Sequence, residues 1–271
     1  MPSSADFSAA PGPADRRPAT TSRAQAPAKP FLLLSTRAED AAAHAEQLSF
    51  ARAAGLAPAM LHQLRLERER PKALDLERYG GVIVGGGPYN ASDESKSAVQ
   101  LEVEAWFDDH LAEVLETDFP FFGACYGVGL LGTVGRGRVS RKHGEEAAVV
   151  EVSVTPEGAS DPVLAGLPER FHAMVGHKEA IEELPAGATL LATGASCPVQ
   201  MFRLGRNAYA SQFHPELDAD TFEQRLRIYA DQGYYQPGGN DRAVADARRF
   251  DVARSAQVLR NFTRLHSGHR G

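Results

Sequence analysis

The sequence has only two cysteines, Cys125 and Cys197, among its 271 residues, and they stand in very different local sequences. A disulfide framework is therefore not expected, and a reducing cytosol suits such a chain. No stretch approaches the ~20 consecutive apolar residues that a membrane-spanning helix needs. The most apolar run lies near Phe31–Leu34 and is far shorter. These absences predict a cytoplasmic protein without a membrane span.

The chain also lacks an excess of basic residues, since 29 Lys and Arg stand against 35 Asp and Glu, which gives a net charge of -6. Both signs are mixed along the chain, whereas a nucleic-acid-binding face needs clustered Lys and Arg. The arginines within Leu61–Glu69 alternate with apolar and acidic residues, which favours a solvated face of a strand or helix. Nucleic acid is therefore not expected as a partner.

Paired metal ligands are missing as well. The 9 histidines are scattered, and no Cys or His pair with ligand spacing stands beside a second pair. His172 and His177 lie five apart, but no acidic residue accompanies them in the expected motif. The sequence therefore predicts neither a metal nor another cofactor.

What is present is an ordinary globular composition, with 43% apolar and 24% charged residues, in a chain long enough for one large α/β domain. Residues 1–29 are rich in Ala, Pro and Ser and lack an apolar signal core. We expect a disordered tail there, with an organelle transit peptide as the alternative. One domain is expected over residues 30–218, with a C-terminal helical extension, 219–271, packed on it.

Strand and helix patterns alternate through the first half of the folded part. We expect strands at Phe31–Leu34, within Pro58–Leu66, at Gly81–Val84 and at Phe119–Ala124, and helices at Ala38–Ala54 and Ser97–Leu115. This alternation predicts an α/β fold with an open, doubly wound, mostly parallel sheet and helices on both faces.

The second half changes rhythm and adds a β-hairpin region to the predicted sheet. We expect a half-exposed strand at Ala147–Thr155, a hairpin of Val199–Leu204 and Ala208–Phe213 around the turn Gly205–Asn207, a helix at Ala219–Ala230, a Gly-rich loop at Gln232–Asp241 and a final amphipathic helix at Arg242–Leu265. The exposed face of that last helix could dock a partner or simply cap the core.

Cys125 stands in the pattern G-x-C-x-G, directly after an apolar run and before a helical segment. A nucleophile on a sharp strand-to-helix turn needs small neighbours, here Gly123 and Gly127, because the backbone approaches itself closely. The N–H groups and dipole of the helix start favour the thiolate, which is the attacking species. Taken alone, the pattern fits a buried cysteine in a glycine-rich turn equally well.

A candidate base lies in Ser211–Glu216, where His214 follows a predicted strand and Glu216 comes two residues later. Beyond Pro215, the carboxylate of Glu216 can turn back to accept a hydrogen bond from the imidazole and fix its tautomer. A lone His before Pro is more often structural. The joint occurrence with the Cys125 turn favours a catalytic triad of Cys125, His214 and Glu216.

The loop Gly85–Asn90 follows the strand expected beside that of Cys125 and should lie at the same edge of the sheet. Acyl transfer needs two N–H donors aimed at the oxyanion, and we expect those of Gly87 and Tyr126 to serve. The competing interpretation is a phosphate-binding loop. It is disfavoured because no Lys-Ser or Lys-Thr pair follows Gly87 and the G-x-G-x-x-G spacing is absent.

These motifs resemble the class I glutamine amidotransferase domain, the Cys-triad type found in the glutaminase half of GMP synthase. The likeness spans residues 31–216 and rests on Gly86–Pro88, Gly123–Gly127, Met174–Lys178 and Phe213–Glu216, in the family's chain order. The resemblance implies a flavodoxin-like sheet, a γ-glutamyl thioester on Cys125 and release of ammonia. It further implies that His214 deprotonates the thiol and protonates the leaving ammonia before water frees glutamate.

Two positions depart from the family's pattern. Gly129 stands where the family usually has a Gln that contacts the amino-acid end of the substrate, and Gly176 stands where relatives often carry Ser. We place Gly86, Gly129 and His177 in the substrate pocket, with His177 shaping the pocket rather than acting as a second base. Lys178 and Glu179 are interpreted as a solvated pair. The expected substrate is glutamine or another γ-glutamyl compound.

No ATP-binding loop is recognisable after Glu216. The first hypothesis is therefore a glutaminase that passes ammonia to a separate synthetase partner. The alternatives are an independent hydrolase of γ-glutamyl conjugates, with water as the acceptor, and a catalytically idle fold retained for binding.

Overall fold

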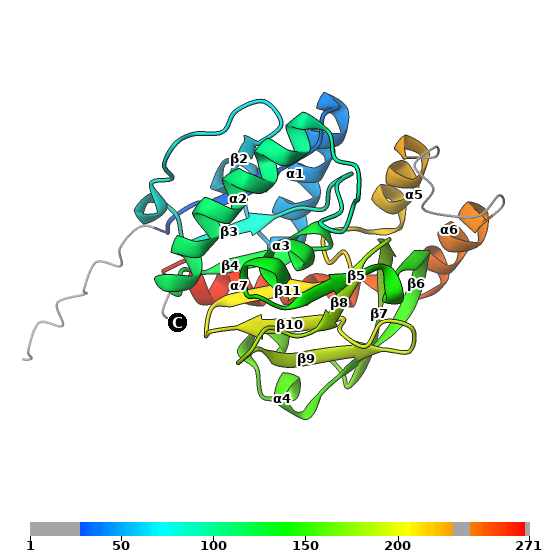
Figure 1. Cartoon of the computed structure of the whole chain (residues 1–271). Coiled ribbons are helices and arrows are strands. Elements are labelled where there is room, and N and C mark those ends of the chain that lie inside the picture. Colours follow the sequence, from blue (N-terminus) through cyan, green and yellow to red (C-terminus); the bar gives the residue numbers. More distant parts are fainter. Residues whose placement is uncertain (1–27, 230–238, 269–271) are drawn as a thin grey trace, which may run out of the picture.

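The computed structural model describes residues 28–229 and 239–268 and is built around a nine-stranded sheet in the order β2-β1-β3-β4-β11-β10-β9-β6-β7 (Figure 1). The first five strands in this order, β2, β1, β3, β4 and β11, are paired in parallel. The pairings from β11 onward, through β10, β9 and β6 to β7, are antiparallel. The strands are β1 (Phe31–Ser35), β2 (Leu61–Arg65), β3 (Gly81–Val84), β4 (Phe121–Ala124), β6 (Glu145–Val154), β7 (Arg170–His177), β9 (Thr189–Gly194), β10 (Met201–Leu204) and β11 (Ala208–Ser211). The predicted α/β class and flavodoxin-like sheet are confirmed.

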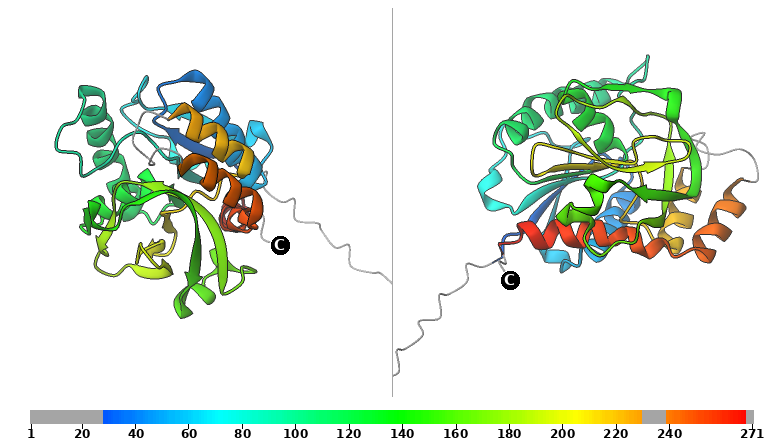
Figure 2. Two further views of the ribbon diagram at one scale, coloured as in Figure 1. Left: turned by 90° about the vertical axis from the view of Figure 1, so that its right-hand side faces the viewer. Right: turned by 90° about the horizontal axis from the view of Figure 1, so that it is seen from below.

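Helices cover both faces of the sheet. They are α1 (Asp40–Ala54), α2 (Ala98–Glu116), α3 (Tyr126–Val134), α4 (Pro156–Ala159), α5 (Ala219–Ile228), α6 (Gly239–Arg249) and α7 (Gln257–His266). Because successive strand residues point to opposite faces, Phe31 and Leu33 pack with α1 and α7, whereas Leu32 and Leu34 pack with α2 and α3. Seen from below, α7 runs in red across the molecule (Figure 2). In the described ranges no helix combines the length and apolarity that a membrane crossing requires.

Local signals in the sequence account for several element boundaries. Gly55 ends α1 in the left-handed region, with φ 69°, and the Ser97 hydroxyl caps α2 by accepting from the amide of Gln100 at 3.1 Å. In the predicted hairpin, Gly205 adopts φ 64°. The Asp118 carboxylate accepts the Asn207 amide at 3.1 Å and so fixes the turn.

The antiparallel part is larger than the single hairpin expected from the sequence. Strands β9, β6 and β7 extend the sheet beyond β10, and β5 (Arg138–Ser140) pairs with β8 (Ala180–Glu183) in a separate two-stranded sheet. Of these strands, the sequence predicts only β6. The others are short or interrupted by Gly, which weakens their alternation as a sequence signal.

The single final helix predicted over Arg242–Leu265 is wrong. α6 ends at Arg249, a 3₁₀ segment covers Val252–Ala256, and α7 follows. The break is a tertiary effect, because the ring of Phe250 stacks on that of His172 with centroids 4.2 Å apart. Most of the predicted tail and of the predicted loop 232–241 lie outside the described residues, although α6 begins within the latter.

Helix α7 is anchored by hydrogen bonds to the segment around Val163 and to the end of α1, and by packing on the sheet. The Asn261 amide donates to the carbonyls of Val163 and Ala165, at 2.9 and 2.8 Å, and the Thr263 hydroxyl donates to that of Ala54 at 2.8 Å. Phe262 is fully buried, and its ring lies 5.6 to 6.2 Å from those of Phe31, Phe122 and Tyr209. This helix is therefore part of the core.

Replacing Phe262 with Ala should destabilise the fold by about 3–5 kcal/mol, the usual cost of removing a buried aromatic ring. Leu265→Ala, in the same helix but 45% exposed, should change stability by less than about 0.5 kcal/mol. Denaturant unfolding followed by circular dichroism measures both. Equal costs for the two variants would show that α7 contributes no core.

Candidate active site

The residues singled out from the sequence converge at the carboxyl edge of the parallel strands. Cys125 follows β4, the glycines 85–87 follow β3, and His214 lies three residues beyond β11. β11 pairs in parallel with β4, and the amide of Cys125 donates to the carbonyl of Ser211 at 2.8 Å. This register places the two segments side by side despite their separation in the chain.

The backbone at Cys125 is strained, with φ 52° and ψ -93°, and α3 starts at the next residue. A Cβ at Gly123 would lie 2.8 Å from the carbonyl carbon and oxygen of Gly127, so glycine is required there. A Cβ at Gly127 would meet Val84 at an ordinary 3.5 Å. Gly123 is therefore the position that permits the turn, and the turn presents the half-buried thiol at the start of α3.

His214 and Glu216 form a buried pair beside the thiol. The imidazole Nδ1 lies 2.8 Å from Glu216 Oε1, and the Arg225 guanidinium of α5 donates to the same oxygen at 2.7 Å. The Cys125 thiol, which donates to the carbonyl of Gly176 at 3.9 Å, interacts electrostatically with His214. The structure thus brings the three proposed triad residues together and adds Arg225.

Electrostatics favour the charged forms of this pair. Burial alone would lower the pKa of His214, but the charges of Glu216 and Cys125, with their hydrogen bonds, raise it to about 9. Burial alone would raise the pKa of Glu216, but His214 and Arg225 lower it to about 2. Near neutral pH, His214 beside the sulfur is therefore an imidazolium held by the Glu216 carboxylate.

The glycine loop closes on this group. A Cβ at Gly86 would lie 2.8 Å from Cε1 of His214, and one at Gly87 would lie 2.3 Å from the Thr36 hydroxyl. Within the described residues, neither the Gly87 nor the Tyr126 amide donates to a protein acceptor. Both amides are thus available to an incoming oxygen atom, and their assignment as the oxyanion hole stays a prediction.

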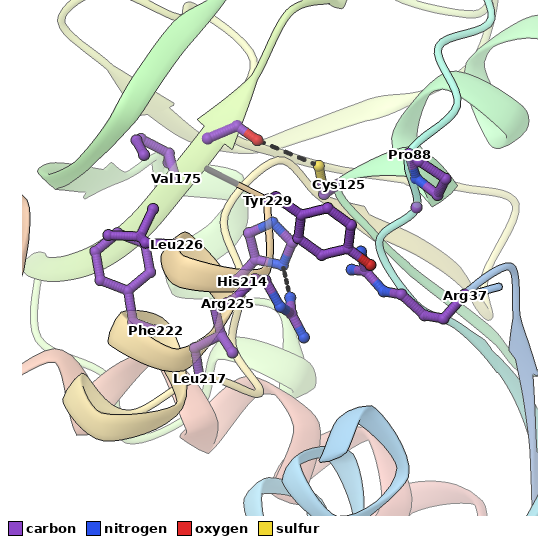
Figure 3. Close-up of a pocket in the computed structure, with 13 residues that line it drawn as sticks. Arg37, Pro88, Cys125, Val175, His214, Leu217, Phe222, Arg225, Leu226 and Tyr229 are labelled. Atoms are coloured by element: carbon purple, nitrogen blue, oxygen red, sulfur yellow. Dashed lines mark hydrogen bonds between the residues drawn. The ribbon is translucent and has the colours of Figure 1, made fainter. Parts of the chain in front are cut away.

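Two cavities meet at Cys125 and share Gly87, Cys125 and Gly176. The smaller, of about 250 Å³, has several residues with polar side-chain atoms in its wall and is called the polar cavity for that reason; it includes Tyr89, Asn90, Tyr126, His177, Glu179 and Gln212. The larger, of about 540 Å³ and open to solvent, is mainly apolar and includes Ala147, Val175, His214, Leu217, Phe222 and Leu226 (Figure 3). Of the two cavities, His214 borders only the apolar one.

The predicted pocket residues occupy different places. His177 lines the polar cavity, whereas Gly86 and Gly129 are not among the residues lining either one. A Cβ at Gly129 would lie 2.8 Å from Glu179 Oε1, so the space that a side chain would need there is filled by that carboxylate. The family's Gln could not be accommodated at position 129 without moving Glu179.

The interpretation of Glu179 as part of a solvated pair is wrong. Its side chain is buried, and the carboxylate accepts from the amides of Ala91 and Ser92 at 2.8 and 2.7 Å. The two bonds fix the loop that carries Tyr89 and Asn90. The sequence could not reveal this contact, because its partners lie 87 and 88 residues away.

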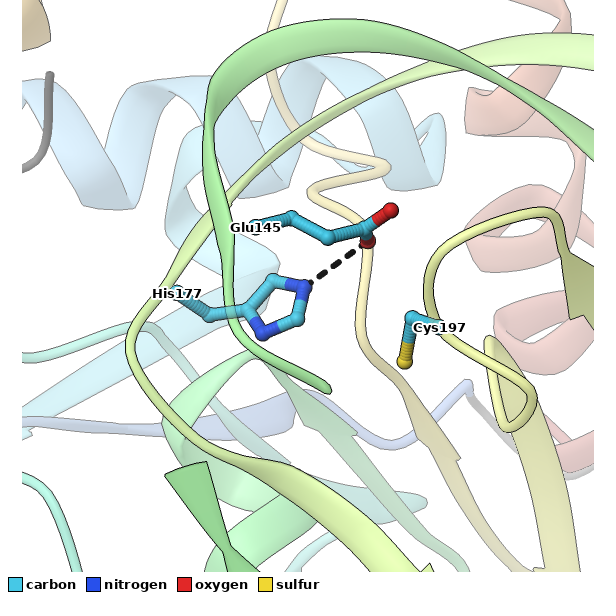
Figure 4. A group of neighbouring side chains, drawn as sticks. All are labelled: Glu145, His177 and Cys197. Carbon is cyan, nitrogen blue, oxygen red and sulfur yellow. Dashed lines mark hydrogen bonds and ion pairs between the residues drawn. The ribbon is translucent and has the colours of Figure 1, made fainter. Parts of the chain in front are cut away.

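One group of potential metal ligands occurs in the part of the chain that the structure describes. The ligand atoms of Glu145, His177 and Cys197 all lie within 4.8 Å of one another (Figure 4). Glu145 Oε2 is already 2.9 Å from His177 Nε2 and accepts from Gln200 at 2.7 Å. Burial, and then the charge of Glu145, raises the pKa of the Cys197 thiol to about 12, against the thiolate that zinc requires. Hydrogen bonding explains this group, and we assign no metal to it.

Sequence reasoning missed two cations at the site, the partly buried Arg225 and the buried Arg37. Arg225 stood in the predicted helix Ala219–Ala230, and its place between Phe222 and Leu226 on an amphipathic pattern was a usable signal. Arg37 follows β1 and pairs with Glu46 at 3.1 Å, with both side chains at most 5% exposed. Its guanidinium lies 5.0 Å from the ring centre of Tyr229 and borders the apolar cavity.

The family model described as "Glutamine amidotransferase class-I" matches residues 51–228, more than half of the chain. A glutamine-hydrolyzing GMP synthase of Thermomicrobium roseum is 37% identical over 139 residues, which cover 51% of this chain and 23% of that protein. One of Bacillus mycoides is 30% identical over 158 residues, covering 58% and 28%. The match thus spans about a quarter of the length of these relatives.

Solved structures give the same fold. A glutamine amidotransferase of Thermotoga maritima superimposes with a TM-score of 0.68 at 23% identity, covering 88% of this chain and 98% of that one. A glutamine amidotransferase of Methylobacillus flagellatus gives 0.64 at 18% identity, covering 90% and 98%. At these identities the likeness concerns the fold alone.

Iodoacetamide at pH 7 should label Cys125 and leave Cys197 unmodified in the native protein. Cys125 faces an imidazolium, whereas Cys197 is fully buried with a pKa raised to about 12. Peptide mass spectrometry resolves the two sites, and His214→Ala should slow labelling of Cys125. Comparable labelling of both cysteines would contradict the proposed activation.

The raised pKa of His214 should make stability depend on pH. The folded state holds this proton more tightly than the unfolded state, so its contribution is complete below pH 6.5 and is lost as the pH rises through about 9. We expect wild type to lose on the order of 1–3 kcal/mol more than His214→Gln across this window. Urea unfolding at pH 6 and pH 9.5 tests this, and parallel losses would refute the shift.

Proposed function

The chain belongs to the class-I glutamine amidotransferase family, and from this premise we propose that it hydrolyses the side-chain amide of glutamine or of a related γ-glutamyl compound. The observation that carries the proposal is the meeting of a strained Cys125, a His214 with raised pKa and a Glu216 with lowered pKa. An idle binding fold would have no need to maintain this strained and charged arrangement.

In the proposed first step, Cys125 Sγ attacks the amide carbon as the thiolate, its proton being held on His214. The amides of Gly87 and Tyr126 donate to the oxygen, which becomes negative in the tetrahedral intermediate. His214 then gives the proton to the nitrogen, the C–N bond breaks, and a γ-glutamyl thioester remains on Cys125.

In the second step, His214 accepts a proton from water, whose oxygen attacks the thioester carbon. The C–S bond breaks, the sulfur leaves as the thiolate, His214 keeps the proton taken from water, and glutamate leaves as the acid product. Glu216 keeps the imidazole oriented throughout, and Arg225 holds Glu216 in turn. We propose that ammonia formed from glutamine passes to a separate synthetase, as the names of the longer relatives suggest, or to solvent.

Replacing Cys125 with Ala should abolish this reaction. Glutamate release from L-glutamine and from γ-L-glutamylmethylamide is expected to fall by at least about 10³-fold, because no other group can form the thioester. Cys197→Ala is the matched control and should keep wild-type rates. Equal rates in wild type and Cys125→Ala, or no glutamate from either amide, would refute the proposal.

A further inference from the structure

The apolar cavity beside Cys125 is larger than an ammonia leaving group needs. The centres of water-sized molecules have about 50 Å³ of room in it, whereas roughly 10–15 Å³ on this measure is enough for one molecule of the size of water or ammonia. Its apolar wall is made by Ala147 and Val175 of the sheet and by Leu217, Phe222 and Leu226 in and before α5. In Figure 3, Val175, Leu217, Phe222 and Leu226 lie on one side of His214.

The chemistry decides which part of a substrate enters which cavity. His214 must protonate the departing nitrogen, and His214 borders the apolar cavity but not the polar one. The substrate oxygen is held at Gly87 and Tyr126, so the acyl chain is left with the polar cavity. The leaving amine therefore faces the apolar cavity.

The polar cavity suits the acyl side. An α-amino acid end needs charged or polar partners, and Gln212 in this wall offers one. Gln212 is 1% exposed, and its Oε1 has no hydrogen-bond partner in the described part of the chain. A buried acceptor without a partner is costly unless a ligand donates to it.

The charges around the apolar cavity favour a neutral group. The two cations that line it are already paired, Arg37 with Glu46 and Arg225 with Glu216. The described lining residues include no carboxylate, so a second amine on the leaving group would be desolvated without a counter-ion. A carboxylate on the leaving group would compete with Glu46 and Glu216 for the arginines.

We propose that the substrate is an N-substituted γ-glutamyl amide whose leaving amine carries an uncharged apolar group, seated against α5. This inference rests on the proposed hydrolysis through Cys125 and names its substrate class. Water remains the acceptor of the acyl group, and the products are glutamate and the apolar amine.

Glutamate is the common product, so one assay compares all substrates on the intact chain. Wild type should hydrolyse γ-L-glutamylbenzylamide with a kcat/KM at least about tenfold above that for L-glutamine, since apolar contacts in such pockets discriminate by this factor or more. γ-L-Glutamyl-(4-aminobutyl)amide, which adds a cation, and γ-L-glutamylphenylalanine, which adds a carboxylate, should not share the gain.

A pair of variants on β6 tests whether the preference for an apolar leaving amine arises in this cavity. Ala147 lines the cavity and Ala148 packs on the opposite face. Ala147→Leu should lower the ratio of kcat/KM for the benzylamide to that for glutamine about tenfold, because added methyl groups take up the space of the ring. Ala148→Leu should leave both rates and their ratio unchanged.

The outcomes separate the two proposals. If glutamine is hydrolysed and the benzylamide is not preferred, or if a charged amide is the best substrate, the apolar class is overturned while hydrolysis through Cys125 stands. If no amide yields glutamate, both fail. The comparison of substrates on wild type needs no variant, so it remains a test even if Ala147→Leu folds poorly. If a folded Ala147→Leu keeps the wild-type ratio of kcat/KM for the benzylamide to that for glutamine, the apolar group does not bind in this cavity.

Discussion

The organisation of the site depends on one buried carboxylate, that of Glu216. A charge so completely removed from water is tolerated only when it is paired, and Oε1 is paired with both His214 and Arg225. The first bond orients the imidazole toward the sulfur. The second ties the loop after β11 to α5, so the helix that forms the apolar wall is joined electrostatically to the proposed catalytic group. Glu216 Oε1 thus holds both the proposed catalytic base, His214, and, through Arg225, the helix that lines the apolar cavity.

The sequence predicted the parallel half of the sheet and the strand-to-helix turn at Cys125 well, because both rest on local signals. Buried parallel strands are short apolar runs, and the turn at Cys125 needs the small residue found at Gly123. Adjacent strand ends then bring Cys125, Gly87 and His214 to one edge. This much follows from topology without any knowledge of side-chain contacts.

The contacts that give the site its character could not be predicted in this way, because they join residues far apart in the chain. The sequence suggested a solvated Glu179, yet this residue fills the space beside Gly129 and holds the loop at Ala91 and Ser92. Charge pairs such as Arg37 with Glu46 leave no periodic pattern. The break between α6 and α7 carries neither Gly nor Pro and arises where Phe250 stacks on His172.

The strand order has a consequence for the synthesis of the protein. β11 is the last strand of the described chain but lies in the interior of the sheet, between β4 and β10. A nascent chain that has not yet reached β11 exposes the edge of β4 and holds Cys125 without its imidazole. Such non-local pairing is slow to form, since loop closure must precede it. Until β11 has been made and has paired with β4, the proposed nucleophile Cys125 therefore lacks its proposed base, His214.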